Sequence, residues 1–241
     1  MLYAKLKYGY SISSTEGTNN ILAIYDYLAP LGYTKVCVAG MLGNMVQESG
    51  LNPWLWQGNS VDLSANDKGY GLFQFTPAYE YINNCSGVPG YGPSLSVTNP
   101  TPGATSDDGY AQLYVFDHDT LGKWYRPLWR DYWSTSQNPV TYSMYQNLML
   151  EYGYNDRLDI SQFKAIDILT YTTLAFLGCY EGPGDKTAAH PERLTIDENF
   201  DVRYNFAQQI YEILEPYGGR DNLTITLKIL DRHHKRHFEN I

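Results

Sequence analysis

The feature that most constrains this sequence is an apolar segment, residues 161–179, which reads SQFKAIDILTYTTLAFLGC. At helical spacing it is apolar on nearly all sides. A helix of this kind must be surrounded by other elements, so the segment predicts a central buried helix with Ser161 as its N-cap. The chain has 241 residues, 43% of them hydrophobic, and can enclose such a helix in a full core.

Further helices are predicted where apolar residues recur at helical spacing. These segments are residues 19–31, 34–49, the start of 110–133, and 200–217. The second has the clearest pattern, because Val38, Leu42 and Met45 recur along one face. Its N-cap is expected at Thr34 and its C-terminal turn at Gly50.

Two segments rich in Gly, Pro, Asn and Ser are predicted to be loops. Residues 52–68 are expected to form a loop with a short hairpin, and residues 85–109 a long loop. Trp54 and Trp56 lie in the first loop, where they either stack on a sugar face or pack in the core.

The last part of the chain differs in character. Residues 223–229 alternate apolar and polar side chains, the period of a half-buried strand, and a basic cluster follows at 233–237. We therefore expect a domain over residues 1–219 and an extension over residues 220–241. The strand is expected either to add to the sheet of a partner protein or to pair with residues 2–8.

The balance of charge and the pattern of hydropathy exclude several classes of function. The net charge of −9 disfavours nucleic acid as a partner, since binding to phosphates needs a basic surface. No apolar run is long enough for membrane insertion, and the first residues lack the apolar core of a signal peptide. The three cysteines have no metal-binding spacing, and Cys37 and Cys179 are expected to be buried. Neither a metal nor a cofactor is predicted.

The residue of greatest chemical interest is Glu48, in the last turn of the helix predicted over residues 34–49. It falls at the end of the apolar stripe of that helix, where burial is expected. Burial and the negative end of the helix dipole both favour a protonated carboxyl group. Glycoside cleavage needs such an acid, because the leaving sugar oxygen must receive a proton. The alternative is a carboxylate that turns outward at a frayed helix end.

Three motifs in order favour catalysis. Residues 43–49 read Gly-Asn-Met-Val-Gln-Glu-Ser, residues 69–77 read Gly-Tyr-Gly-Leu-Phe-Gln-Phe-Thr-Pro, and residues 180–184 read Tyr-Glu-Gly-Pro-Gly. This set resembles the lysozyme-like and lytic transglycosylase superfamily, and most closely the phage tail lysozyme family, over residues 20–217. The resemblance implies a mainly α (α+β) fold, a lysozyme-like helical domain with a small β or loop lobe that forms one wall of the cleft.

Carried onto this sequence, the resemblance makes Glu48 the general acid. The residues that it places in the cleft, in contact with the sugar, are Tyr70, Gly71, Gln74, Tyr180 and Glu181. Glu181 replaces the Asn of the transglycosylase motif, and the motif is one residue shorter here. The role of Glu181 is therefore open between a glycan contact and a structural partner buried against the helix.

A hydrolase also needs a second carboxylate, about 5–5.5 Å from the acid in retaining enzymes and about 6.5–9.5 Å in inverting ones. Asp62 and Asp67 lie in the loop expected to face Glu48, and Asp67 is the preferred candidate because it adjoins the second motif. Each is alternatively a turn-forming Asp. Without a second carboxylate the resemblance implies a lytic transglycosylase, in which the sugar's own 6-hydroxyl closes on the anomeric carbon.

The resulting hypothesis is a peptidoglycan-cleaving glycosidase, a muramidase or a lytic transglycosylase, that acts on the β-1,4 bond between N-acetylmuramic acid and N-acetylglucosamine. Resemblance to tail lysozymes implies a virion component that opens the host wall during genome delivery. Its expected partners are glycan strands and other phage tail proteins. A free endolysin shares this chemistry. The alternative from another class is a structural tail or glycan-binding protein that keeps the fold without turnover.

Overall fold

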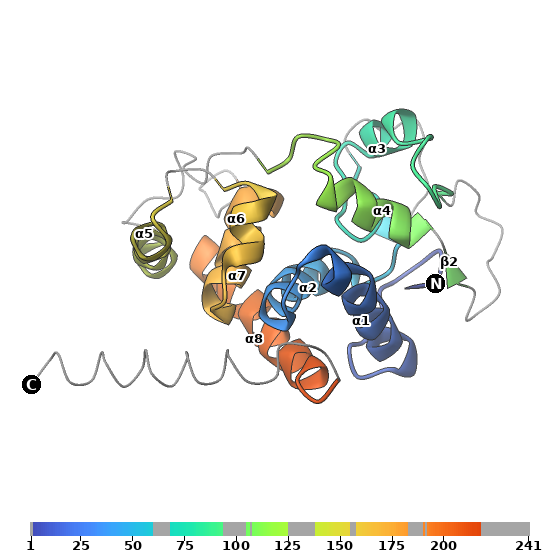
Figure 1. Ribbon diagram of the computed structural model, residues 1–241. Helices are drawn as coiled ribbons and strands as arrows, with labels where there is room; N and C mark the ends of the chain where they lie inside the picture. The colour runs from blue at the N-terminus through green and yellow to red at the C-terminus, as the bar shows by residue number, and fades with distance from the viewer. Residues whose placement is uncertain are drawn as a thin grey trace, which may run out of the picture.

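The computed structural model describes residues 2–59, 68–93, 105–106, 108–124, 138–154, 158–182, 190 and 192–217. Within these ranges the chain is mainly α-helical (Figure 1), which confirms the predicted class. The α-helices are α1 (Thr15–Leu28), α2 (Lys35–Ser49), α3 (Ala78–Asn84), α4 (Asp108–Asp117), α5 (Pro139–Tyr152), α6 (Ile160–Ala165), α7 (Leu169–Phe176) and α8 (Ile196–Leu214). The shorter elements are the 3₁₀ turns η1 (Ala29–Leu31) and η2 (Gln57–Asn59), the π-helical turn η3 (Leu177–Glu181), and the strands β1 (Leu2–Tyr3) and β2 (Thr105–Ser106).

A β lobe is not seen in the described part of the chain. The two-residue strands β1 and β2 form one antiparallel pair. Apart from β2, the described residues between α2 and α4 form loops, the turn η2, the short helix α3 and two isolated bridges, Trp56 with Tyr70 and Tyr70 with Phe75. The rings of Trp56 and Tyr70 lie 4.9 Å apart, and Tyr70 packs against Tyr81 of α3 at 6.0 Å. Aromatic packing rather than a strand ladder therefore holds this part of the chain together.

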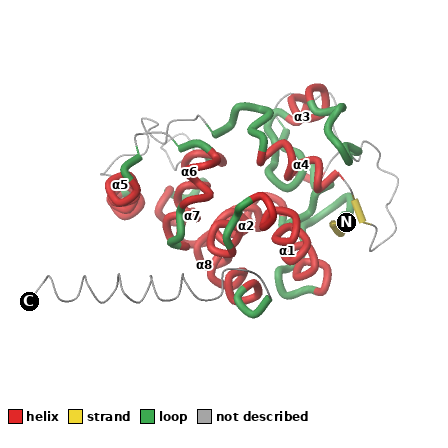
Figure 2. The backbone as a smooth tube through the Cα atoms, in the orientation of Figure 1, coloured by secondary structure: helices red, strands yellow, loops and turns green. Residues whose placement is uncertain are grey.

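Helix α2 is the centre of the fold, with α1, α7 and α8 packed around it (Figure 2). Its residues are buried on nearly every side. Two glycines allow its neighbours to approach the backbone. A Cβ at Gly40 would overlap the side chain of Thr172 in α7, and a Cβ at Gly43 would lie 2.5 Å from the carbonyl oxygen of Arg203 in α8.

The predicted ends of α2 are confirmed. The Thr34 hydroxyl accepts a hydrogen bond from the backbone N–H of Cys37 at 3.1 Å, and Gly50 ends the helix in the left-handed conformation at φ 54°. Helices α1 and α8 begin earlier than predicted. Ser14 caps α1 through the N–H of Gly17, and Thr195 caps α8 in a capping box, so side-chain caps rather than the first apolar residues set both starts.

The prediction of one continuous helix over residues 161–179 is wrong. Helix α6 ends at Ala165, the backbone is extended at Ile166, and α7 begins at Leu169. The break lets the Asp167 carboxylate accept a hydrogen bond of 2.6 Å from the Tyr152 hydroxyl of α5. The N-cap is Asp159 rather than Ser161, because Asp159 forms a capping box with Gln162. Most of the buried residues of the segment lie in α7 and η3, and Phe163 and Ile166 are buried as well.

The sequence pattern does not predict helix α5, because few of its side chains are apolar and buried, while Val140 and Leu150 are exposed.

The predicted burial of Cys37 and Cys179 is confirmed. No helix in the described ranges is both long and apolar enough to span a membrane. Residues 218–241 lie outside the described chain, so the boundary at 219 and the strand over 223–229 remain predictions.

The contact at Gly43 yields a prediction for stability. Gly43→Ala is expected to lower the free energy of unfolding by about 1–3 kcal/mol, because the added Cβ meets backbone and Cβ atoms of α8 rather than the end of a flexible side chain. Urea unfolding followed by circular dichroism measures this. Gly87→Ala is the control, since nothing lies within 4 Å of a Cβ there. Equal midpoints for the two variants would contradict the close packing of α2 on α8.

Candidate active site

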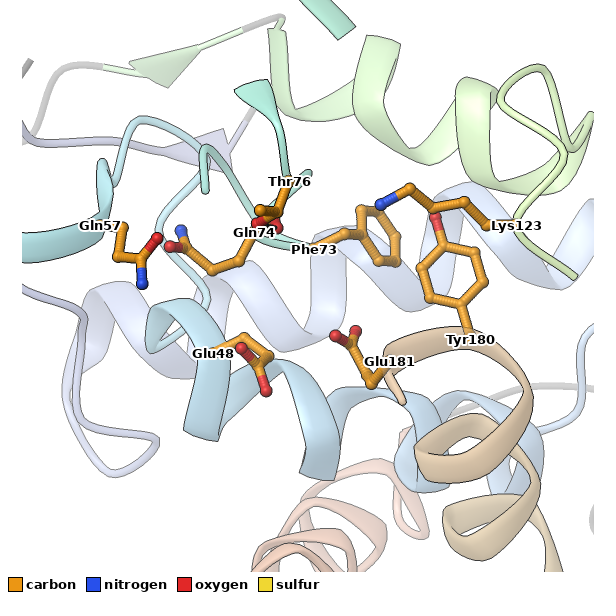
Figure 3. Close-up of a pocket in the computed structure, with 8 residues that line it drawn as sticks. All are labelled: Glu48, Gln57, Phe73, Gln74, Thr76, Lys123, Tyr180 and Glu181. Carbon is orange, nitrogen blue, oxygen red and sulfur yellow. Dashed lines mark hydrogen bonds between the residues drawn. The ribbon is translucent and has the colours of Figure 1, made fainter. Parts of the chain in front are cut away.

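A pocket of about 380 Å³ lies at the C-terminal end of α2 (Figure 3). It brings together residues from α2, from the second motif, from the segment after α4 and from η3. The residues that line it are Glu48, Gln57, Phe73, Gln74, Thr76, Lys123, Tyr180 and Glu181. Parts of all three sequence motifs therefore meet in one pocket.

Glu48 lies in the last turn of α2 with its side chain 24% exposed. Its carboxylate Oε1 accepts a hydrogen bond of 2.6 Å from Nη2 of Arg203, which lies on α8 and is 3% exposed. The guanidinium thus balances the charge of Glu48 from beneath the pocket. Sequence reasoning missed Arg203. The sequence feature that could have identified it is its spacing: Arg203 is a cation within the apolar stripe of α8, between Phe200 and Ala207.

Ser49 connects the two walls of the pocket. Its buried hydroxyl lies 3.1 Å from the carbonyl oxygen of Met45 in α2 and 3.0 Å from that of Leu72 in the second motif. The residue after the candidate acid therefore fixes the position of the opposite wall relative to the end of α2.

Gln74 lines the pocket from the second motif. Its backbone is in the left-handed region at φ 42°, and its Nε2 donates hydrogen bonds of 3.0 Å to the carbonyl oxygens of Leu55 and Gly71. Tyr70 and Gly71 lie behind this wall and not among the residues that line the pocket. Tyr70 is fully buried, and a Cβ on Gly71 would overlap the amide of Gln112. Gln74 and Glu48 therefore line the same pocket, whereas Tyr70 and Gly71 lie in the wall behind Gln74.

Tyr180 and Glu181 stand at the end of η3, a π-helical turn that Gly182 closes at φ 55°. The Tyr180 ring is nearly buried and packs on Phe73 at 5.5 Å and on Phe176 at 4.9 Å. Glu181 is half-buried and extends into the pocket from the side opposite Gln74 (Figure 3). π-Helical turns within helices are frequent at functional sites, where they redirect a side chain. Here Glu48 and Glu181 line the same pocket.

The family to which these motifs belong can now be stated. The phage tail lysozyme family matches this chain over residues 19–214, which include the whole pocket. The chain belongs to the phage tail lysozyme family. It is also similar to morphogenesis protein 1 of Bacillus phage B103, with 45% identity over 83 residues. That similarity covers 34% of this chain and 21% of the relative, so the chain spans about a fifth of that protein.

A buried polar network supports the second motif. Asp108, at the start of α4, accepts hydrogen bonds from the Tyr70 and Tyr81 hydroxyls at 2.9 and 2.6 Å. Gln112, one turn later, accepts from the N–H of Leu72 at 2.7 Å and donates to the Asp108 carboxylate at 2.7 Å. Sequence reasoning missed both residues, because they lie about forty positions from the loop that they hold.

The structure also shows where several other candidate residues lie. Asp62 and Asp67 lie outside the described residues. Trp56 is buried in the core against Tyr70, whereas Trp54 is half-buried. Lys123 lines the pocket with its ammonium 5.2 Å from the centre of the Phe75 ring. No group of three potential metal ligands occurs in the described ranges.

Cys37 and Cys179 are unsuited to nucleophilic catalysis. Burial raises the pKa of the Cys37 thiol well above its usual range, and it raises the pKa of the Cys179 thiol in the same way. Both thiols are fully buried and away from the pocket, so neither supplies a thiolate near neutral pH.

The support of the second motif yields a prediction. Gln112→Leu removes the acceptor for the backbone N–H of Leu72. It also removes the amide that donates to the carbonyl oxygen of Pro53 and to the carboxylate of Asp108. We expect a loss of roughly 1–3 kcal/mol for each group left unsatisfied. Thermal and urea unfolding measure the loss, with the exposed Gln208→Leu as the matched control. A Gln112→Leu variant as stable as that control would show that the network does not hold the loop.

Proposed function

We propose that this member of the phage tail lysozyme family cleaves the β-1,4 bond between N-acetylmuramic acid and N-acetylglucosamine in bacterial peptidoglycan, with Glu48 as general acid. The observation that carries the proposal is the pocket at the end of α2, where Glu48 meets Gln74, Tyr180 and Glu181. Membership of the phage tail lysozyme family supports the same activity.

In the proposed reaction the glycan lies in the pocket with its scissile oxygen beside Glu48. Proton transfer from Glu48 to that oxygen releases the leaving sugar, while positive charge develops at the anomeric carbon. Gln74 and Tyr180 form opposite walls of the pocket and are proposed to orient the sugar. Tyr70 and Gly71 are proposed to act indirectly, by holding the wall to which Gln74 belongs.

A second carboxylate in the pocket favours hydrolysis over transglycosylation. Glu181 enters the cleft together with Glu48. Paired carboxylates allow one group to protonate the leaving oxygen while the other activates water or attacks the anomeric carbon. We therefore propose Glu181 for the role that sequence analysis assigned to Asp67, with the 6-hydroxyl reaction of a lytic transglycosylase as the competing outcome.

The proposed place of action is the phage tail. The similar phage B103 protein is named a morphogenesis protein, and the family is named for tail lysozymes. We propose that this chain is carried in the virion with other tail proteins and opens the host wall during genome delivery. Its presence in purified virions, probed by mass spectrometry, separates this role from that of a free endolysin.

The first prediction from this proposal concerns Glu48→Gln, which keeps the side-chain size and removes the acidic proton. Release of glycan fragments from purified peptidoglycan is expected to fall by about 10²–10⁴-fold, the usual contribution of a general acid. Mass spectrometry of released fragments measures this, and the exposed Glu212→Gln is the control. A wild type that binds peptidoglycan but releases no fragments would instead favour a structural glycan-binding protein.

The second prediction concerns the partner carboxylate. Glu181→Gln is expected to lose at least about 10²-fold in fragment release, whereas Asp67→Asn keeps most of the activity. Wild-type fragments are expected to carry reducing muramic ends. Anhydro-muramic ends, together with an active Glu181→Gln variant, would show that the reaction is transglycosylation rather than hydrolysis.

A further inference from the structure

A buried cation beneath the candidate acid is not explained by packing alone. Arg203 occupies a position of the apolar stripe of α8 and is 3% exposed. Among the described residues its Nε has no hydrogen-bond acceptor. A buried charged group with an unsatisfied N–H costs stability, and an apolar side chain would fill this stripe more favourably. The position of Arg203 therefore points to a role at the pocket.

The guanidinium holds two points of α2 at once. Nη2 donates to the Glu48 carboxylate at 2.6 Å, and Nη1 donates to the carbonyl oxygen of Asn44 at 3.1 Å. Asn44 lies one helical turn before Glu48, so the fork joins the acid's side chain to the backbone beneath it. A lysine ammonium lacks this planar fork.

The first motif supplies the surface on which Arg203 rests. Gly43 lets α8 approach until a Cβ at that position would lie 2.5 Å from the Arg203 carbonyl oxygen. The Asn44 amide donates hydrogen bonds to Gly40 in α2 at 2.9 Å and to Thr173 in α7 at 3.1 Å. Gly43 and Asn44 thus fix the distance and the orientation from which Arg203 reaches Glu48.

We propose that Arg203 is the positioning residue of Glu48: it fixes the carboxyl group at the edge of the pocket, in the orientation from which the acid delivers its proton. This inference rests on the proposed role of Glu48 as general acid. Arg203 lies behind Glu48 and outside the pocket lining, so it acts through Glu48 rather than on the sugar.

Charge and fork can be separated by substitution. A lysine keeps a positive charge near Glu48 but lacks the planar fork that also holds the carbonyl oxygen of Asn44. A methionine removes both. Three other titratable side chains line the same pocket, Lys123 from the segment after α4 and Tyr180 and Glu181 from η3. All three are kept in every variant of position 203, so a difference between variants reports the change at 203.

The test compares Arg203→Met, Arg203→Lys and the exposed control Arg193→Met as full chains. For each, initial rates of fragment release are measured over a series of concentrations of purified peptidoglycan. Pelleting with insoluble peptidoglycan measures binding, and circular dichroism checks the fold.

We expect Arg203→Met to lose about tenfold or more in rate with binding unchanged, because a displaced acid slows proton transfer. Arg203→Lys should lose part of the rate and keep the wild-type binding, since the charge remains without the fork. Arg193→Met should match the wild type in rate and in binding.

A folded Arg203→Met variant with the wild-type rate, or one that loses binding in proportion to its rate, would overturn the inference, and so would an Arg203→Lys variant with the full wild-type rate. If the Met variant does not fold, Arg203→Gln, which removes the charge but keeps an amide donor, must show the same loss of rate with binding unchanged. The proposed function fails separately: it is lost if the wild type is inactive or if Glu48→Gln remains active.

Discussion

The close packing of α7 and α8 on the backbone of α2 is the interaction on which the rest of this structure depends. Gly40 admits Thr172 of α7, and Gly43 admits the backbone of α8 around Arg203. This contact places α2 at the centre of the fold. The C-terminal end of a helix, whose free carbonyl groups often bind water, is here in contact with three other parts of the chain. The pocket forms at that end, so its position follows from how α2 is enclosed.

The pocket walls are held mainly by side chains that bond to backbone groups. Ser49 binds the carbonyl oxygen of Leu72, Gln74 binds those of Leu55 and Gly71, and Gln112 receives the N–H of Leu72. Loops without a regular ladder must satisfy their polar backbone in this way when they are buried. Several positions of the sequence motifs therefore serve the shape of the site, and the chemistry is left to a few groups that face the cavity.

Local sequence was sufficient where a structural feature depended on neighbouring residues. The limits of α2 followed from Thr34 and Gly50, because caps act over a few positions. Sequence failed over residues 161–179, where a contact between Asp167 and Tyr152 interrupts a segment whose composition suits one helix. It also failed for α5, whose apolar pattern is too weak to distinguish it from a polar loop.

The sequence by itself determined the helical class, the family resemblance and the nomination of Glu48, since each rests on short motifs or on periodicity along a single element. Tertiary structure alone decided which motif residues face the pocket. It placed Gln74 and Glu181 beside Glu48 and set Tyr70 and Gly71 behind the wall. It also decided that a cation from α8, 155 positions away, would meet the candidate acid. Charge acts through space rather than along the chain, so the environment of Glu48 was fixed only when α8 packed on α2.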